Sequence, residues 1–536
     1  MTQIATTPLV TTPVGVHGAK WRVLIGAVVV QLILGTIYGY SVFWQPLEAE
    51  LWPPVLTQAQ VQALEAGGRS VPAHGMIVAD GQAAAQEREA RIGTLKYAFA
   101  ICLLSFATAM VFAGRLQDVK GPRFTAMLGG VILGVAFIIS SLMNHVVTFY
   151  VCHALLMGSV VVVVLLLFEA LFKGVDREQY PLLQYVPHGI VTVAVVLGIA
   201  VGNEYVSNGT HNKVFVLWAT IGLLAGVGIG YAYVCPIAAL VKWFPEHKGL
   251  VSGVAVAGFG LGAYIFSGKS AIGAVGFIEA YGIRTFFLVH GLICAAAVMA
   301  GASMLRNPPE AAPALTPISG KKNPSADTNW VELLRTGRFY VIWVMFFSGA
   351  MAGLMVIGIL KPFAGNQLVA TASVGAVMDD ALRSELLLKG ATAVGVLALF
   401  NAAGRVIWGL LSDQLGRTTA MIMMFTLQGL TLLLLVTLKS EWQLAIGAAC
   451  VGFNFGGNFA LFPSLTADLF GSKNFGANYG WVFTSYGVAG VMGVWLGNVA
   501  QRMTGSYFAA FALASVLCFI SAILALALRR ARAAAV

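Results

Sequence analysis

Arg405 is the residue of this sequence best suited to bind a charged ligand, because it lies inside an apolar run at 389–411. A guanidinium within a membrane helix is costly to bury, so we expect it to face a water-filled cavity or a polar partner. Its planar fork of N–H groups matches the two oxygens of a carboxylate. Asn401 lies four residues earlier, hence on the same helix face. Together they offer a charge and an amide to one small anion.

Two simpler interpretations of Arg405 stay open at this point. The side chain could reach the headgroups at the cytoplasmic membrane surface, or it could pair with a carboxylate in the following loop. Asp413 is about 12 Å further along the helix axis, so the membrane surface is within reach.

Tyrosine hydroxyls and asparagine amides in other apolar segments can donate to a carboxylate without adding a charge. Each of these side chains could equally serve in packing or in hydrogen bonds between helices. The predicted substrate-binding residues are Arg405, Asn401, Tyr38, Tyr231, Tyr486 and Asn454, with Trp44, Tyr233, Asn458 and Tyr479 as further candidates.

The segments that carry these residues predict a membrane protein with many spans. The 536 residues are 58% apolar and 10% charged, with a mean hydropathy of +0.83, whereas soluble proteins carry about 25% charged residues. Apolar runs of 18 or more residues recur, and each can cross about 30 Å of hydrocarbon. We expect an all-α membrane protein with about 14 transmembrane helices. They lie roughly at 22–45, 94–114, 123–144, 147–171, 187–204, 214–240, 248–268, 284–305, 338–360, 389–411, 418–438, 443–466, 476–499 and 506–528.

A short loop between apolar segments occurs twice, 295 residues apart. The first copy holds Gly114, Asp118, Gly121 and Arg123, and the second holds Gly409, Asp413, Gly416 and Arg417. An internal repeat in a hydrophobic chain suggests a secondary transporter built from related halves around a central site. Each aspartate can cap a helix N-terminus and pair with the arginine of its own loop.

A second landmark shows where the halves differ. Pro236 with Phe244 and Gly249 resembles Pro463 with Phe470 and Gly476, but this landmark recurs after only 227 residues. About 68 extra residues therefore lie in the first half, which is the length of 145–212. The simplest interpretation is a 12-helix protein with one inserted helical hairpin.

Composition and charge set the expected domains. We predict a cytoplasmic tail at 1–20, an N-terminal bundle at 21–305, a Pro-rich cytoplasmic linker at 306–337, a C-terminal bundle at 338–530 and a tail at 531–536. External loops are expected at 46–92 and 362–388. Short basic turns fall on one side, as the positive-inside rule requires for cytoplasmic termini. The net charge of +10 therefore indicates membrane orientation rather than a nucleic-acid partner, since no basic patch with interleaved aromatics occurs.

The paired Gly-x-x-x-Asp-x-x-Gly loops resemble the signature of the major facilitator superfamily. More specific stretches resemble its oxalate/formate antiporter family, which includes lactate and other monocarboxylate carriers. These stretches are Gly35–Phe43, Gly228–Tyr231 leading to Lys242–Pro245, Gly258–Gly260, Gly353–Gly358 and Phe475–Gly480. The resemblance implies a two-bundle fold in which the repeated loops latch the cytoplasmic gate. It also implies that the arginine at the position of Arg405 binds the substrate.

One departure from that family bears on the substrate. Oxalate exchangers carry a lysine in the penultimate conventional helix, where this chain has Tyr486. A single cation suits a monoanion better than a dianion, because a second carboxylate would be left poorly solvated.

The remaining polar residues in apolar segments suggest weaker hypotheses. Glu169, His153 and His188 lie in or near the inserted hairpin and could carry protons, and Lys361 could act at the outer gate. The six cysteines form no CxxC pair and are expected to be buried. Because no metal constellation, nucleophile elbow or P-loop occurs, we expect no enzyme activity, no cofactor and no metal.

The sequence thus predicts a monomeric inner-membrane carrier of small carboxylates that works by alternating access. Monocarboxylates such as lactate, pyruvate or formate are favoured and oxalate is also allowed, by antiport or by proton symport. The alternatives are a multidrug or metabolite exporter of the same superfamily, or a membrane sensor that binds a metabolite without moving it.

Overall fold

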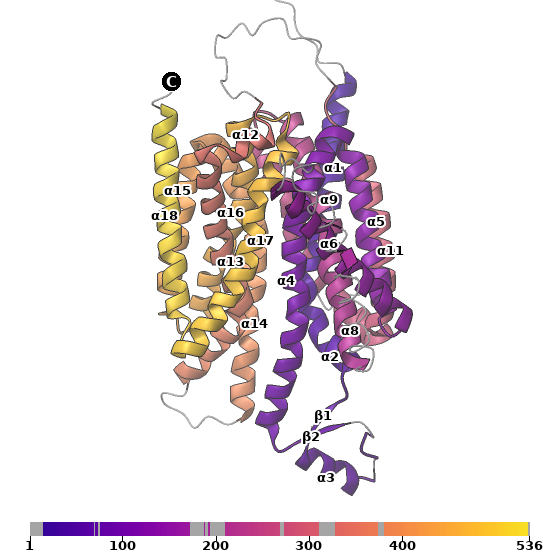
Figure 1. Ribbon diagram of the computed structural model, residues 1–536. Helices are drawn as coiled ribbons and strands as arrows, with labels where there is room; N and C mark the ends of the chain where they lie inside the picture. Colours follow the sequence, from indigo (N-terminus) through magenta and orange to yellow (C-terminus); the bar gives the residue numbers. More distant parts are fainter. Residues whose placement is uncertain are drawn as a thin grey trace, which may run out of the picture.

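The computed structural model describes residues 14–68, 70–72, 75–171, 187, 191–192, 209–267, 273–309, 327–372 and 380–533. Within these residues, twelve helices are long and apolar enough to cross a membrane, six before the linker and six after it. Figure 1 shows the first six gathered in one bundle and the last six in another. The all-α, two-bundle architecture predicted from the sequence is confirmed.

The N-terminal bundle is built from α1 (Val14–Leu34), α4 (Gly81–Lys120), α5 (Pro122–Ser141), the continuous stack of α8 (Gly209–Leu217), η3 (Trp218–Leu224) and α9 (Ala225–Trp243), α10 (Lys248–Ser267) and α11 (Ala274–Ser303). A 3-10 segment, η1 (Gly35–Phe43), continues α1. The C-terminal bundle is built from α13 (Gly337–Ala372), α14 (Asp380–Leu415), α15 (Arg417–Leu435), α16 (Glu441–Phe470), α17 (Phe475–Thr504) and α18 (Phe508–Ala533), and the short α12 (Trp330–Leu334) precedes it.

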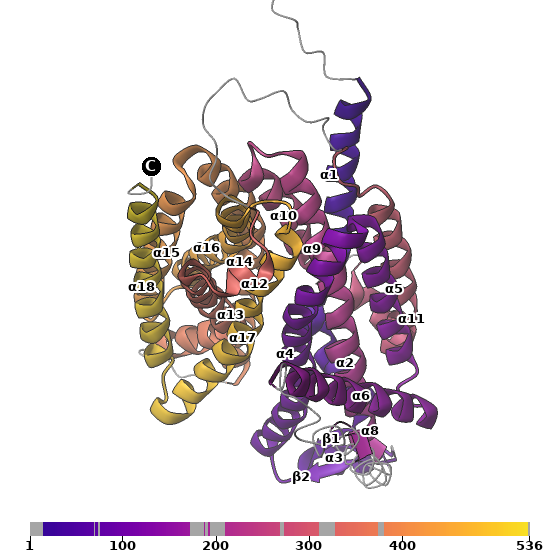
Figure 2. The ribbon, with the colours of Figure 1, turned by 45° about the horizontal axis from the view of Figure 1, so that its top comes forward.

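The predicted inserted hairpin is only partly within the described residues. Its first helix is α6 (Val146–Leu171), which packs against α8 and η3 at the N-terminal bundle (Figure 2). The second predicted helix, 187–204, lies outside the described residues apart from positions 187, 191 and 192. The segment η3 beside α6 is a π-helix, a rare form that commonly marks a local insertion in a helix.

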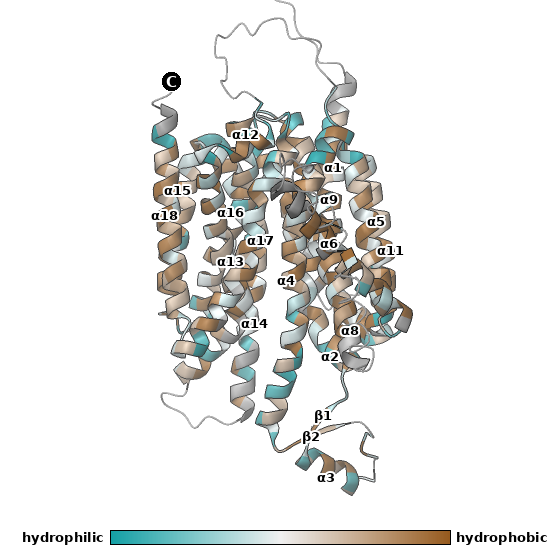
Figure 3. Cartoon of the chain, viewed as in Figure 1, coloured by the Kyte–Doolittle hydropathy of each residue, from teal (hydrophilic) through white to brown (hydrophobic). Residues whose placement is uncertain are grey.

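Polar residues collect at the two ends of the bundles and apolar residues between them (Figure 3). We call the end that carries the turns at Gly121 and Gly416 the terminal face, because α18, the last helix, ends there (Figure 1). At each of these turns φ is +88°, a conformation that side chains other than glycine's adopt only with strain. The repeated glycines of the loop motif therefore reverse the chain between α4 and α5 and between α14 and α15.

At the opposite end, the described residues of the segment predicted as an external loop at 46–92 form helices and strands. The segment contains α2 (Trp44–Leu51), α3 (Gln58–Ala66) and two paired parallel strands, β1 (Val55–Thr57) and β2 (Met76–Val78). Arg91 of α4 ties this unit to that helix, with Nη1 3.1 Å from Glu48 of α2. Within α4, the Nε of Arg91 lies 2.9 Å from Glu87. The sequence left short helices open here but did not predict the strands. It also placed the start of the second span at 94, whereas Asp80 caps α4 and the helix begins at Gly81.

Two helix pairs make the largest contacts between the bundles: α4 packs against α17, and α10 packs against α14. Their backbones touch near the terminal face, where Gly114 lies against Gly476 and Gly249 lies against Gly409. A Cβ on Gly409 would lie 2.4 Å from the carbonyl oxygen of Gly249, so glycine is required for this approach. The two copies of the loop motif therefore lie where the bundles meet.

Candidate functional site

Arg405 lies in α14 and is completely buried, with 0% of its surface exposed. Its Nε donates to Asn401 Oδ1 at 2.8 Å, one turn earlier on the same helix. Its Nη1 donates to the carbonyl oxygen of Val256 at 2.6 Å, on α10 of the other bundle. The guanidinium therefore lies between the bundles, and its orientation is fixed from both sides.

Two aromatic rings flank the guanidinium, one from each bundle. The Arg405 Cζ atom lies 4.5 Å from the ring centroid of Phe459 in α16 and 5.7 Å from that of Phe259 in α10. Rings at this distance attract a cation through their quadrupoles, more strongly where water is excluded. They do not neutralise its charge.

No ion pair of Arg405 is found among the described residues, and its buried Nη2 atom has no hydrogen-bond partner there. Asp413 pairs with Arg417, and Asp468 with Lys248 and Arg417. Neither simpler interpretation of Arg405 is supported, because its side chain has no exposed surface and bonds to Asn401 and Val256 rather than to Asp413. A buried cation without a counter-charge is unfavourable, and a bound anion would relieve that cost.

Four tyrosines, two from each bundle, lie near Arg405. Tyr38 and Tyr233 pack edge-on against Phe259, and Tyr486 packs edge-on against Phe459, the two rings that flank the guanidinium. Tyr38 and Tyr486 share a hydrogen bond between their hydroxyl oxygens that crosses from η1 to α17. The hydroxyls of Tyr233 in α9 and Tyr479 in α17 are buried and have no partner among the described residues. Hydroxyl donors thus lie around the cation, and two of them are unused.

Two predicted residues are not shown to join this cluster. Tyr231 is half-buried on α9, and no contact between it and Arg405 is described. Residues two apart on a helix point about 200° apart, so the side chain that faces Arg405 is Tyr233 instead. Asn454 is buried in α16 with neither polar atom partnered in the described chain, while the neighbouring Asn458 packs against Gly349 of α13.

Sequence reasoning missed Gln31, which is fully buried in α1. Its Nε2 donates to the carbonyl oxygen of Tyr233 at 3.0 Å, and its Oε1 has no partner among the described residues. The sequence feature that could have identified Gln31 is an amide side chain inside an otherwise apolar span.

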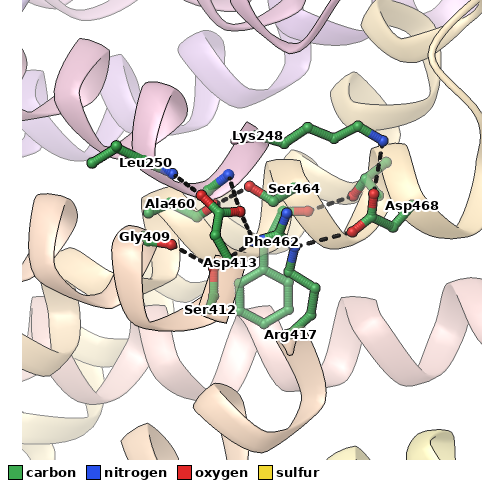
Figure 4. A network of polar contacts seen from close by, with 12 residues as sticks. Lys248, Leu250, Gly409, Ser412, Asp413, Arg417, Ala460, Phe462, Ser464 and Asp468 are labelled. Carbon is green, nitrogen blue, oxygen red and sulfur yellow. Dashed lines mark hydrogen bonds and ion pairs between the residues drawn. The ribbon is translucent and has the colours of Figure 1, made fainter. Parts of the chain in front are cut away.

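Asp413 joins the bundles at the terminal face (Figure 4). Its two carboxylate oxygens accept hydrogen bonds from the backbone N–H groups of Gly249 at 3.0 Å and Leu250 at 2.8 Å, in the first turn of α10. This end of a helix carries partial positive charge and stabilises a carboxylate. Within its own bundle, Asp413 pairs with Arg417.

The same network contains a second contact between the bundles. Arg417 Nε donates to Asp468 Oδ2 at 3.0 Å, and Lys248 Nζ, from α10, lies 2.7 Å from Asp468 Oδ1. Four charged side chains of alternating sign therefore close this part of the terminal face (Figure 4).

Asp118 makes the equivalent helix contact in the first copy of the motif. It accepts from the N–H groups of Gly476 at 3.1 Å and Ala477 at 2.8 Å, in the first turn of α17. Each aspartate thus caps a helix of the opposite bundle, and the capped turns begin at Gly249 and Gly476, which the sequence had already matched as repeats.

The predicted pairing of Asp118 with Arg123 is wrong. Arg123 is exposed, and the cation beside Asp118 is Lys242, with Nζ 4.0 Å from Oδ1. Pro122 follows Gly121 directly, where Arg417 follows Gly416. Arg123 is therefore one position late, which turns it about 100° around the helix and away from the aspartate.

The residues proposed for proton transfer and for the outer gate are only partly visible. His188 and the side chains of Glu169 and Lys361 lie outside the described residues. His153 is half-buried on α6 between the rings of Phe149 and Phe215. Within the described residues, no group of three or more His, Cys, Asp or Glu could hold a metal ion.

Comparison with known protein families shows to which family this chain belongs. The family model of the Major Facilitator Superfamily matches residues 185–379 and 363–535.

The chain belongs to the major facilitator superfamily.

Relatives within this superfamily bear out the resemblance seen in the sequence. The oxalate:formate antiporter of Oxalobacter formigenes is 31% identical over 306 residues, covering 56% of this chain and 67% of the relative. An uncharacterized MFS-type transporter of Escherichia coli, YhjX, is 24% identical over 482 residues, covering 90% and 88%. Monocarboxylate transporter 12 of Xenopus laevis is 25% identical over 358 residues, covering 62% and 74%.

Solved structures support the same fold. The human organic anion transporter MFSD10 aligns with a TM-score of 0.53 at 13% identity, covering 94% of this chain and 99% of that one. This likeness concerns the fold alone.

The unpaired charge of Arg405 has a consequence for stability. Arg405→Met keeps much of the side-chain volume and removes the charge, so without substrate we expect the free energy of unfolding to stay the same or rise, by up to about 4 kcal/mol. Arg417→Met, which removes an arginine paired with two carboxylates, should instead lower it by about 1–3 kcal/mol. Denaturation in detergent measures both variants. A large loss of stability in Arg405→Met would mean that the guanidinium holds the fold together.

Proposed function

We propose that this major facilitator is a secondary active transporter of small organic anions, with Arg405 as the residue that binds the substrate carboxylate. The single observation that carries the proposal is a completely buried guanidinium, held between the two bundles, with no carboxylate partner in the described chain. Supporting evidence comes from relatives named as an oxalate:formate antiporter and a monocarboxylate transporter.

A carboxylate has two oxygens that together accept several hydrogen bonds. The free Nη2 of Arg405 and the unpartnered hydroxyls of Tyr233 and Tyr479 supply donors of matching chemistry. Asn401 is less available than the sequence suggested, since its Oδ1 already accepts from Arg405. We assign it the role of orienting the guanidinium.

The charge of the site favours monocarboxylates such as lactate, pyruvate or formate. The lysine of the family's oxalate exchangers is replaced by Tyr486, whose hydroxyl is shared with Tyr38. Lys242 and Lys248 pair with aspartates at the terminal face. One guanidinium balances one carboxylate, and a second would be buried without a counter-charge. Oxalate remains allowed at lower affinity.

Alternating access follows from where the contacts lie. The terminal face is closed by Asp118 and Asp413, whose contacts join opposite bundles. Opening that face requires both aspartates to leave the helices that they cap. We place this face in the cytoplasm of a bacterial inner membrane, because its short turns are basic, with the protein working as a monomer. Antiport of two anions and symport with a proton both fit this cycle.

Uptake of labelled organic acids into proteoliposomes tests the role of Arg405. Arg405→Ala and Arg405→Lys should each lower transport at least about 100-fold, because losing the charge or its planar fork removes the charge-assisted bonds to the substrate. Arg502→Ala, which changes an exposed arginine at the end of α17, is the matched control and should transport normally.

Normal uptake of lactate, pyruvate, formate and oxalate by either Arg405 variant would remove this residue from the site. Export of hydrophobic cations that does not depend on Arg405 would instead identify a multidrug exporter.

Competition by anions of different charge tests the single-cation argument. In the wild-type protein, formate or lactate should inhibit labelled monocarboxylate uptake better than oxalate does. Tyr486→Lys adds a cation beside Tyr38 and should shift that preference toward oxalate by about tenfold or more. Tyr486→Phe, which adds no charge, is the control. Stronger inhibition of the wild-type protein by oxalate would show that the argument from charge is wrong.

A further inference from the structure

The buried Gln31 of α1 joins three helices of the N-terminal bundle. Its Nε2 donates to the carbonyl oxygen of Tyr233 in α9 at 3.0 Å. A Cβ on Gly258 of α10 would lie 3.5 Å from the Gln31 Cβ and 2.9 Å from the Val28 carbonyl oxygen. Helices α1 and α10 therefore pack with their backbones close together, and the Gln31 side chain extends from this contact to α9.

The carbonyl that Gln31 reaches lies in a turn of α9 that cannot make all of its own hydrogen bonds. Pro236 lies inside α9, and because proline has no N–H it cannot donate to the carbonyl of Ala232, four residues earlier. A turn that lacks one of its bonds bends more easily than a complete one. In membrane proteins, neighbouring helices stabilise such turns. Gln31 bonds the carbonyl next to the affected one, so it holds this turn from α1.

The turn that Gln31 holds carries the side chain of Tyr233 toward the guanidinium. The Tyr233 ring packs edge-on against Phe259, with 5.4 Å between centroids, and the Phe259 centroid lies 5.7 Å from the Arg405 Cζ atom. The Tyr233 ring also lies 5.4 Å from that of Phe483 in α17, so it is placed between the bundles. Its hydroxyl is buried and has no partner in the part of the chain that the structure describes. A shift of the α9 turn would therefore displace this free hydroxyl donor relative to Arg405.

Packing alone does not account for a glutamine at position 31. Its side chain is fully buried, and its Oε1 has no hydrogen-bond partner among the described residues. A buried acceptor without a partner is unfavourable, and a methionine of similar size would fill the same space without one. The bond to the Tyr233 carbonyl is therefore the property that distinguishes Gln31 from an apolar residue here.

We propose that Gln31 is a positioning residue of the substrate site, whose bond to the Tyr233 carbonyl holds the Tyr233 hydroxyl where it can donate to a carboxylate on Arg405. The carboxylate then receives a neutral donor from the N-terminal bundle in addition to the charged donor from the C-terminal bundle. This inference rests on the proposed function, because it concerns the same site. When the bond is removed, anion binding should weaken while the movement of the bundles keeps its rate.

Transport kinetics of labelled lactate in proteoliposomes test the proposal. Gln31→Met keeps the side-chain volume and removes the amide, so we expect KM to rise about three- to tenfold while the maximal rate stays the same. Tyr233→Phe should raise KM by at least as much. The double variant should have the KM of Tyr233→Phe, because Gln31 acts only through that hydroxyl. An unchanged KM in Gln31→Met, or full additivity in the double variant, would overturn the proposal.

The matched control is Gln428→Met, which makes the same change in the other bundle. Gln428 is a buried glutamine of α15 whose amide atoms bond to nothing within the described residues, so KM should stay unchanged. An equal rise of KM in this control would contradict a specific role for Gln31. If Gln31→Met does not fold, Gln31→Asn carries the test, because its side chain is one methylene shorter and does not reach the carbonyl.

Fluorine NMR without substrate separates this inference from the proposed function. The signal of 3-fluorotyrosine at position 233, assigned with Tyr233→Phe and recorded in nanodiscs, should shift or broaden in Gln31→Met but not in Gln428→Met. This result, combined with normal transport by Arg405→Ala, would leave the positioning of Tyr233 intact and contradict the carboxylate site. An unchanged fluorine signal in Gln31→Met would contradict the positioning itself.

Discussion

The uncompensated positive charge of Arg405 is the constraint on which the centre of this protein depends. Its guanidinium is kept from water, bonded to one bundle through Asn401 and to the other through the Val256 carbonyl, and flanked by one ring from each. None of these neighbours carries a negative charge. A folded protein tolerates such a group when the charge is used elsewhere in its cycle, and here a bound anion would complete the ion pair.

The terminal face also depends on charged side chains, but there the charges are paired. Two repeated aspartates each cap a helix of the opposite bundle, and paired glycines allow the backbones to come close enough for this. The contact sites are related by the internal repeat, but the charges around them are not. In the second copy Asp413 belongs to a network of four charged side chains, whereas in the first copy the charged side chain beside Asp118 is Lys242. The two parts of the closed face therefore need not have the same strength.

Much of this architecture could be predicted from the sequence, because hydropathy and the repeat report directly on membrane spans and on glycine turns. The placement of Asn401 and Arg405 on one helix face also followed from their spacing of four residues. The sequence could not decide between Tyr231 and Tyr233. Because α9 is apolar and rich in small residues on most faces, its pattern does not show which face points toward the other bundle. The partner of Asp118 was missed because Pro122 shifts Arg123 by one position. Asp327 accepts a hydrogen bond from the backbone N–H of Lys473, and no local sequence pattern predicts a contact between segments so far apart in the chain.

Binding of a monocarboxylate to purified wild-type protein and to Arg405→Met tests the central claim most directly. The account predicts that lactate, pyruvate or formate raises the thermal unfolding midpoint of the wild-type protein, by an amount equivalent to about 2.7 kcal/mol at one hundred times the dissociation constant. The same anions should leave the midpoint of Arg405→Met unchanged, while chloride at matched ionic strength should affect neither protein. Equal stabilisation of both proteins by the carboxylate would show that the anion binds elsewhere and that the buried charge has another purpose.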